Sequence, residues 1–191
     1  MVKVNLKKLF FFVSPILIFI LRAFYDKKYL KGRWFDNHYL GYVWAFKSIF
    51  HNNILRLGKP MPWPTIYSCT VYNSEKIKFD INDLNNFQSK GVYFQNYFGN
   101  ITIGNGVYIA PNVGIITSNH DLQNLDNHNQ ADDVIIGDKC WIGMNVVILP
   151  GVCLPTGTIV AAGAVVTKSF ADENCIIGGS PAKIIKSTSR S

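Results

Sequence analysis

A period of six residues in the second half of the chain constrains its fold more than any other feature. An aliphatic residue recurs at every sixth position in two blocks. An amphipathic helix would repeat its apolar residues at spacings of three and four, and a half-buried strand would alternate briefly and stop. The period therefore predicts a solenoid of stacked, parallel coils. The aliphatic positions are Ile103, Ile109 and Ile115 in the first block, and Ile136, Ile142, Ile148, Leu154, Val160 and Val166 in the second.

Each hexad is expected to form a short extended stretch followed by a tight corner. A small or β-branched residue stands four positions after the aliphatic residue in the later hexads, and it should fit beneath the turn. The period does not fix the hand of the coil, although parallel crossovers are nearly always right-handed. The small corner residues are Cys140, Val146, Val152, Thr158 and Ala164.

The repeat is interrupted between Ile115 and Ile136. The interval between these two positions is not a whole number of hexads, so a loop at about residues 117–133 must leave the solenoid. The register of residues 64–100 is irregular and is not set by the period. The polar residues of the loop that could carry chemistry are Asn119, His120, Asp121, Asp126 and His128.

Residues 1–60 form a basic segment rich in apolar and aromatic side chains. The apolar run at 9–21 would be about 20 Å long as a helix, whereas the hydrocarbon core of a bilayer is about 30 Å thick. It is too short to span a membrane alone, and no cleavage site follows it. We expect it to lie in the cytoplasmic leaflet; packing against a partner subunit is the alternative. The flanking basic residues are Lys3, Lys7, Lys8, Arg22, Lys27, Lys28, Lys31 and Arg33.

Charge and cysteine content bear on partners and compartment. The net charge is +7, but eight of the 19 basic residues lie in the first 33 positions, so the rest of the chain is close to neutral. This distribution argues against a nucleic-acid partner for the folded body. Four cysteines without metal-ligand spacing are expected to be reduced and packed inside a cytoplasmic protein. The aromatic residues at 34–50 are expected to be core rather than an interfacial belt.

The segments 134–170 and 176–186 resemble the hexapeptide-repeat acyltransferases. The resemblance rests on Trp-Ile-Gly at 141–143, Pro-Gly at 150–151 and Gly-x-Pro-Ala-Lys at 179–183, together with Ile-Thr-Ser-Asn-His-Asp at 116–121. It covers about residues 100–186 and is closest to the bacterial polysaccharide O-acetyltransferases.

What this resemblance implies is a mainly β fold. A left-handed parallel β-helix would occupy residues 61–186, after an apolar, helical N-terminal segment (1–60) and before a tail at 187–191. The active-site loop would protrude from it. A homotrimer with sites between subunits would use acetyl-CoA as donor. The polar residues that hold sugar in the maltose and galactoside enzymes have no match before residue 100.

The resemblance also assigns roles to particular residues. His120 would be the catalytic base, since an imidazole can take the proton of a sugar hydroxyl at neutral pH. A main-chain carbonyl or Asp121 could orient its second nitrogen. The acceptor-binding candidates are Asn119, Asp121 and His128. The coenzyme A candidates are Gly143 and Met144 near the pantetheine, Ala162 through its backbone, and Thr167, Lys168, Lys183 and Lys186 near the phosphates.

Two further side-chain questions arise from the same motifs. Trp141 is expected to pack on the coil surface, with a place beside the cofactor as the alternative. A three-histidine zinc site would need a third histidine past residue 100 besides His120 and His128, so no metal is expected.

These features favour an O-acetyltransferase that moves acetyl from acetyl-CoA to a sugar hydroxyl of a surface polysaccharide or its lipid-linked precursor. It would work in the cytoplasm, at the inner face of the membrane. Acetylation of a soluble sugar, nucleotide amino sugar or serine remains open, as does a non-catalytic scaffold. The sequence identifies neither the acceptor nor the oxyanion donor.

Overall fold

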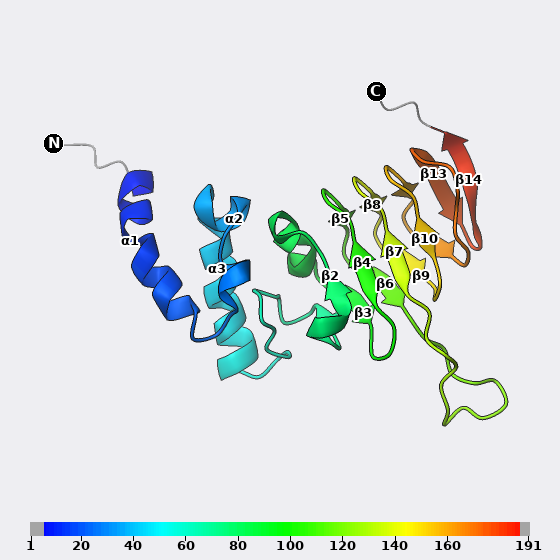
Figure 1. Cartoon of the computed structure of the whole chain (residues 1–191), viewed down its shortest axis with the longest axis horizontal. Coiled ribbons are helices and arrows are strands. Elements are labelled where there is room, and N and C mark those ends of the chain that lie inside the picture. Colours follow the sequence, from blue (N-terminus) through cyan, green and yellow to red (C-terminus); the bar gives the residue numbers. More distant parts are fainter. Residues whose placement is uncertain (1–5, 188–191) are drawn as a thin grey trace.

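The computed structural model describes residues 6–187, with side chains from residue 12 onward. Lys3, the side chains of Lys7 and Lys8, and residues 188–191 of the expected tail lie outside the described part. Helices occupy one end of the molecule and stacked strands the other (Figure 1). The helical end consists of α1 (Leu6–Leu21), η1 (Lys27–Tyr29), α2 (Arg33–Asp36), α3 (Leu40–Ser48) and η2 (Ile49–Ile54).

The strands form three sheets, which we call A, B and C. Neighbouring strands are parallel in every sheet, except for the antiparallel pair β13–β14 that ends sheet C. Sheet A contains β1 (Thr70–Val71), β3 (Tyr93–Gln95), β6 (Gly114–Ile116), β9 (Val147–Ile148) and β12 (Val165–Val166). Sheet B contains β2 (Ile77–Lys78), β4 (Ile101–Ile103), β7 (Val134–Ile136) and β10 (Cys153–Leu154). Sheet C contains β5 (Tyr108–Ile109), β8 (Trp141–Ile142), β11 (Ile159–Val160), β13 (Cys175–Gly179) and β14 (Ala182–Ser187).

From β3 to β12 the chain runs from sheet A to B to C and back to A in each coil, whereas no strand of sheet C lies between β2 and β3 and no strand of sheet B lies between β12 and β13. Ile148 pairs with Val166 in sheet A, and Ile136 pairs with Leu154 in sheet B, so each of the later coils consists of three hexads. Three corners separate the sheets, and we name two of them: the AB edge, where the chain leaves sheet A, and the CA edge, where it returns to sheet A.

The interior confirms the solenoid predicted from the period of six. All nine aliphatic positions of the two blocks are buried, and so are the five small corner residues. They stack as columns because each sheet pairs one hexad with the hexad of the next coil. The hand of the coil stays a prediction.

The first coils are larger than the later ones. Val71 pairs with Phe94, and Phe94 pairs in turn with Ile115, so each of these two coils is longer than three hexads. In the first of these coils, the helical turns η3 (Ser74–Lys76) and η4 (Ile81–Gln88) add the extra length. Bulky side chains fill this wider interior, which explains why the period of six does not extend over residues 64–100. They include Trp63, Leu84, Phe87 and Phe94.

Helix α1 is apolar on both sides. Leu21 is buried, and Leu17 and Ile18 pack against the core. On the other side Phe12 is 83% exposed, and Phe19 is exposed as well. Across residues 6–187, none of the helices combines the length and the apolar character needed to cross a membrane.

The aromatic residues at 34–50 are only partly core. Phe35 and Tyr42 are buried, which agrees with the expectation. Tyr39, Phe46 and Phe50 are exposed, so for these three the expectation was wrong. They lie on α3 and the segments that flank it, at the helical end of the molecule and away from the loop between β6 and β7 (Figure 1).

The cysteines are free thiols, and three of them are packed inside. Burial raises the pKa of Cys69 to about 12 and that of Cys140 to about 11. Cys153 is exposed, because it occupies an outward position of β10 beside the buried Leu154. Packing in the core was therefore the wrong expectation for Cys153.

Candidate active site

The segment between β6 and β7 leaves the coil as a projecting loop (Figure 1). Ile103 of β4 pairs with Ile136 of β7, and the loop lies between these two residues in the chain. The coil that contains the loop is therefore far longer than the three hexads of the later coils. The amide side chain of Gln95 holds its base: Oε1 accepts from Thr117 N at 2.9 Å and from Ser118 N at 3.1 Å. The loop is thus anchored to the preceding coil.

The outer part of the loop is a short hairpin. His120 and His128 form an antiparallel bridge. Asn129 N donates to Asn119 O at 2.9 Å, and Asp121 N donates to Asn127 O at 3.0 Å. The two imidazole rings meet edge to face with centroids 4.4 Å apart. The hairpin therefore brings the catalytic candidate and all three acceptor candidates into one exposed cluster.

The imidazole of His120 has a defined tautomer in this geometry. Nδ1 lies 2.7 Å from the main-chain oxygen of Leu125. A carbonyl oxygen only accepts, so in the neutral ring Nδ1 carries the hydrogen and Nε2 keeps its lone pair. Asp121 instead accepts from Gln123 N at 2.8 Å. The sequence left open whether a main-chain carbonyl or Asp121 orients the imidazole ring. The structure places the carbonyl of Leu125 against Nδ1 of His120.

The coenzyme candidates do not all come together. Gly143, Met144 and Ala162 lie at the CA edge of adjacent coils, where Gly163 N donates to Met144 O at 2.8 Å. A Cβ on Gly143 would stand 2.7 Å from Ala162 N, so these coils touch through their backbones. Met144 and Ala162 are exposed and Gly143 is buried.

The remaining candidates lie elsewhere on the coil. Thr167 and Lys168 follow β12 at the AB edge, the same edge from which the His120 loop leaves. Lys183 and Lys186 are exposed on β14, opposite Gly178 and Ile176 of β13. Within one chain, therefore, the width of sheet A lies between His120 and the group formed by Gly143, Met144 and Ala162.

Trp141 lies on the surface of the coil, as expected. It is 54% exposed on the outer face of β8, paired with the exposed Tyr108 of β5. Both rings line a pocket of about 500 Å³ on sheet C, together with Lys139 and Gly106. Over residues 6–187, no three His, Cys, Asp or Glu side chains are grouped so that they could hold a metal ion.

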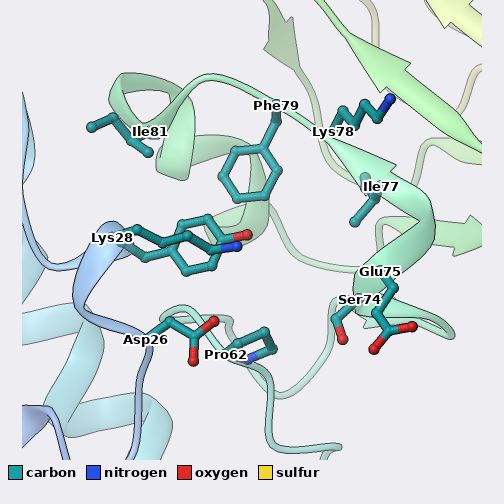
Figure 2. A pocket seen from close by; sticks show the side chains of 10 residues that line it. Asp26, Lys28, Pro62, Ser74, Glu75, Ile77, Lys78, Phe79 and Ile81 are labelled. Carbon is teal, nitrogen blue, oxygen red and sulfur yellow. The ribbon is translucent and has the colours of Figure 1, made fainter.

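A second pocket, of about 670 Å³, joins the helical end to the first coil. Asp26 and Lys28 lie on one wall, with Ser74 and Glu75 on the facing wall (Figure 2). Tyr29 stacks on Phe79 within it, with centroids 5.5 Å apart. Its charges have both signs, and it contains none of the residues that the sequence assigned to the site.

Sequence reasoning missed an aromatic group beside the loop. Tyr72 and Tyr97 stack with centroids 3.9 Å apart, and Tyr72 meets Tyr93 edge to face at 5.6 Å. We call Tyr72, Tyr93 and Tyr97 the tyrosine cluster. Tyr72 and Tyr97 lie just after strands β1 and β3 of sheet A, and Tyr93 is the first residue of β3. The register of the first two coils would have been the signal needed to find this cluster.

Comparison with known proteins agrees with this architecture. The family model described as bacterial transferase hexapeptide (six repeats) matches residues 133–168. A putative acetyltransferase of Staphylococcus aureus is 31% identical over 180 residues, which cover 84% of this chain and 89% of that protein. The chain therefore belongs to the hexapeptide-repeat acetyltransferase family.

Other relatives match over a shorter stretch. A putative acetyltransferase of Schizosaccharomyces pombe is 43% identical over 89 residues, 45% of this chain and 42% of that protein. A putative lipopolysaccharide biosynthesis O-acetyl transferase of Escherichia coli is 36% identical over 102 residues, 45% of this chain and 50% of that protein. The chain spans less than half the length of the first curated relatives that it matches.

Proposed function

We propose that this protein transfers acetyl from acetyl-CoA to a sugar hydroxyl of a bacterial surface polysaccharide or its lipid-linked precursor, with His120 as general base. The observation that carries the proposal is the 2.7 Å contact between His120 Nδ1 and Leu125 O. It leaves Nε2 as the proton acceptor on an exposed loop of a hexapeptide-repeat acetyltransferase.

The chemistry needs one base and one leaving thiolate. Nε2 of His120 takes the hydroxyl proton while the sugar oxygen attacks the thioester carbonyl, forming a C–O bond and a tetrahedral oxyanion. The C–S bond then breaks as the carbonyl reforms, and the imidazolium returns its proton to the thiolate of coenzyme A. Leu125 O stabilises the imidazolium throughout, because its hydrogen bond from Nδ1 strengthens when the ring is charged.

A homotrimer with a left-handed coil would complete the site. Met144 and Ala162 lie at the CA edge, whereas His120 lies on the loop of the AB edge. A second copy that places its CA edge against the AB edge of the first would bring both groups to one donor molecule. In this arrangement Gly143, Met144 and Ala162 face the pantetheine, and Thr167, Lys168, Lys183 and Lys186 bind nearer the phosphates.

The acceptor side of the proposal rests on the loop and the helical end. Asn119, Asp121 and His128 surround His120 and would contact the sugar. The E. coli relative is named for lipopolysaccharide biosynthesis. The exposed apolar side of α1, with Arg22, Lys27 and Lys28 following it, favours contact with an anionic membrane surface at the inner face of the cytoplasmic membrane. Residues 1–60 would serve as this membrane-facing segment and residues 61–186 as the catalytic domain.

Release of free thiol from acetyl-CoA tests the reaction. With cell-envelope glycan present, wild-type protein should release thiol, and His120→Ala should lose roughly 10²- to 10⁴-fold in kcat/KM. His38→Ala is the matched control, since His38 lies in the helical end between α2 and α3. Equal rates for wild type and His120→Ala would refute His120 as the base. Release only with a soluble acceptor would favour the small-molecule alternative, and no acetyl-CoA binding would favour a scaffold.

A further inference from the structure

Aromatic rings continue from the His120 loop along the AB edge without a gap. The ring of His128 touches His120 on one side and Phe98 on the other, with centroids 5.7 Å apart. Phe98 lies 6.2 Å from Tyr97, which stacks on Tyr72 at 3.9 Å. Phe98 is 57% exposed and Tyr97 is 47% exposed. The series therefore presents a continuous, open aromatic surface that begins at the proposed base.

Coil-to-coil pairing explains this placement. Gln95 pairs with Ile116, so the residues that follow Gln95 stack beside those that begin the loop. Tyr72 stands opposite Gln95 one coil earlier, because Val71 pairs with Phe94. Gly114 lies opposite Tyr93 and carries no side chain, which leaves the outer face beside that ring bare. The surface thus leads from the loop toward the helical end of the molecule (Figure 1).

The tyrosine hydroxyls are arranged around one oxygen. Tyr93 donates weakly to Tyr72 at 3.5 Å, and Tyr97 donates to the same hydroxyl. These two hydrogen bonds lower the pKa of Tyr72, whereas burial raises the pKa of Tyr93 to about 12. Because the Tyr72 oxygen accepts from both neighbours, its own O–H can donate outward to a ligand.

The backbone beneath these rings is held in place. Lys59 Nζ donates to Tyr72 O at 2.6 Å, and Lys76 Nζ donates to Phe98 O at 2.6 Å. Asn96 Oδ1 accepts from the main-chain N–H groups of Tyr72 and Asn73, both at 3.1 Å. A surface fixed in this way loses little freedom when a ligand binds.

We propose that the tyrosine cluster and Phe98 form the acceptor subsite for sugar residues that adjoin the acetylated one, so that the acceptor is an oligosaccharide or polymer. The apolar faces of sugar rings would stack on Phe98 and Tyr97, and Tyr72 O–H would donate to a sugar oxygen. The series of rings runs on past Phe98, so a single sugar would leave most of it bare. This proposal rests on the function proposed above, because that function supplies the glycan and places its reacting hydroxyl at His120.

Two substitutions at one position test it. The acceptor probe is bacterial envelope polysaccharide, de-O-acetylated, partly hydrolysed and separated into monosaccharide and oligosaccharide pools. Tyr97→Ala should raise KM for the oligosaccharide pool roughly three- to tenfold, with a smaller change for the monosaccharide pool. Tyr97→Phe keeps the ring and should change the KM for the oligosaccharide pool less than twofold. Tyr67→Ala, an exposed tyrosine outside the cluster, is the control.

Equilibrium binding separates this proposal from the proposed function. Wild-type protein without acetyl-CoA should bind the oligosaccharide pool, and Tyr97→Ala should weaken that binding. Saturation-transfer NMR of the sugar protons measures the binding. Binding without any transfer would refute the proposed function and keep the subsite. Absent binding, or equal binding by both proteins, would overturn the subsite. Loss of the native oligomer in Tyr97→Ala, measured by sedimentation, would make the cluster a subunit contact instead.

Discussion

The coils after the loop and the coils before it share three sheets but differ in their side chains. From Ile136 to Val166 each coil consists of three hexads, and its column is aliphatic. The earlier coils are longer and bury rings such as Phe94. The uniform coils repeat one hexad and form a scaffold. The irregular coils anchor the loop and carry the tyrosine cluster, so departures from the repeat mark the side on which the acceptor chemistry is proposed.

The largest expected effect tests whether the uniform coils depend on backbone contact. In Gly137→Ala the new Cβ would stand 2.7 Å from Thr156 N and 2.9 Å from Leu154 O, and backbone atoms cannot move aside. We expect a loss of about 3 kcal/mol in the free energy of unfolding. Urea denaturation at a fixed protein concentration measures it.

Gly114→Ala is the matched control for that change. Its Cβ would meet only a Val147 methyl at 4.0 Å, in ordinary contact, so we expect a change within about 0.5 kcal/mol. Similar losses in the two variants would mean that the close stacking of coils at Gly137 is not what stabilises them.

A smaller effect sharpens the link between the early coils and the loop. Gln95→Ala removes the acceptor that holds Thr117 N and Ser118 N. We expect a stability loss of about 1–2 kcal/mol, with a fall in kcat/KM for acetyl transfer because the base of the His120 loop is released.

Gln88→Ala removes a comparable amide, which donates to Pro64 O at 2.7 Å away from the loop. It should lower stability to a similar extent and leave kcat/KM unchanged. If both variants lost activity in proportion to stability, Gln95 would be no more than a structural residue.

The smallest effect concerns pH at the end of the loop. The main-chain N–H of Asn100 donates to Asp133 at 2.7 Å and lowers the pKa of this carboxyl. A lowered pKa in the folded state adds stability above the unfolded pKa of about 3.8. That stability is lost as the pH falls through the folded value. Asp133 is exposed, so its contribution should not exceed about 0.5 kcal/mol.

Asp133→Asn tests the sign of this contribution. The stability difference between wild type and this variant should be present at pH 7 and should shrink as the pH falls from about 3.8 through the lower folded-state pKa. Urea midpoints across that range measure it. A difference that grew toward low pH would show that the Asn100 contact does not favour the charged carboxylate.

The sequence predicted the regular part of the fold well, for a physical reason. Inward positions such as Ile142 and Leu154 recur every six residues because each coil repeats the same short strand and corner. The first coil broke the pattern, because η3 and η4 insert helical turns between β1, β2 and β3. Without their register, the sequence could not show that Tyr72, Tyr93 and Tyr97 meet.

The candidate site was predictable by residue type but not by geometry. The resemblance to the hexapeptide-repeat acyltransferases identified His120 as the base candidate. Only the folded hairpin shows that Leu125 O binds Nδ1 while Asp121 bonds to the main chain of Gln123. The outward direction of Cys153 was missed because a hexad's inward positions say little about its outward ones.

Mass spectrometry of the acceptor tests the central claim most directly. Envelope glycan incubated with acetyl-CoA and wild-type protein, then cut into fragments, should contain a fragment that gains one acetyl group as an ester on a sugar oxygen. The same incubation with His120→Ala should leave that fragment unmodified. An acetylated fragment in equal amount from His120→Ala, or none from wild type on any glycan, would contradict the account of His120 as the base of a polysaccharide O-acetyltransferase.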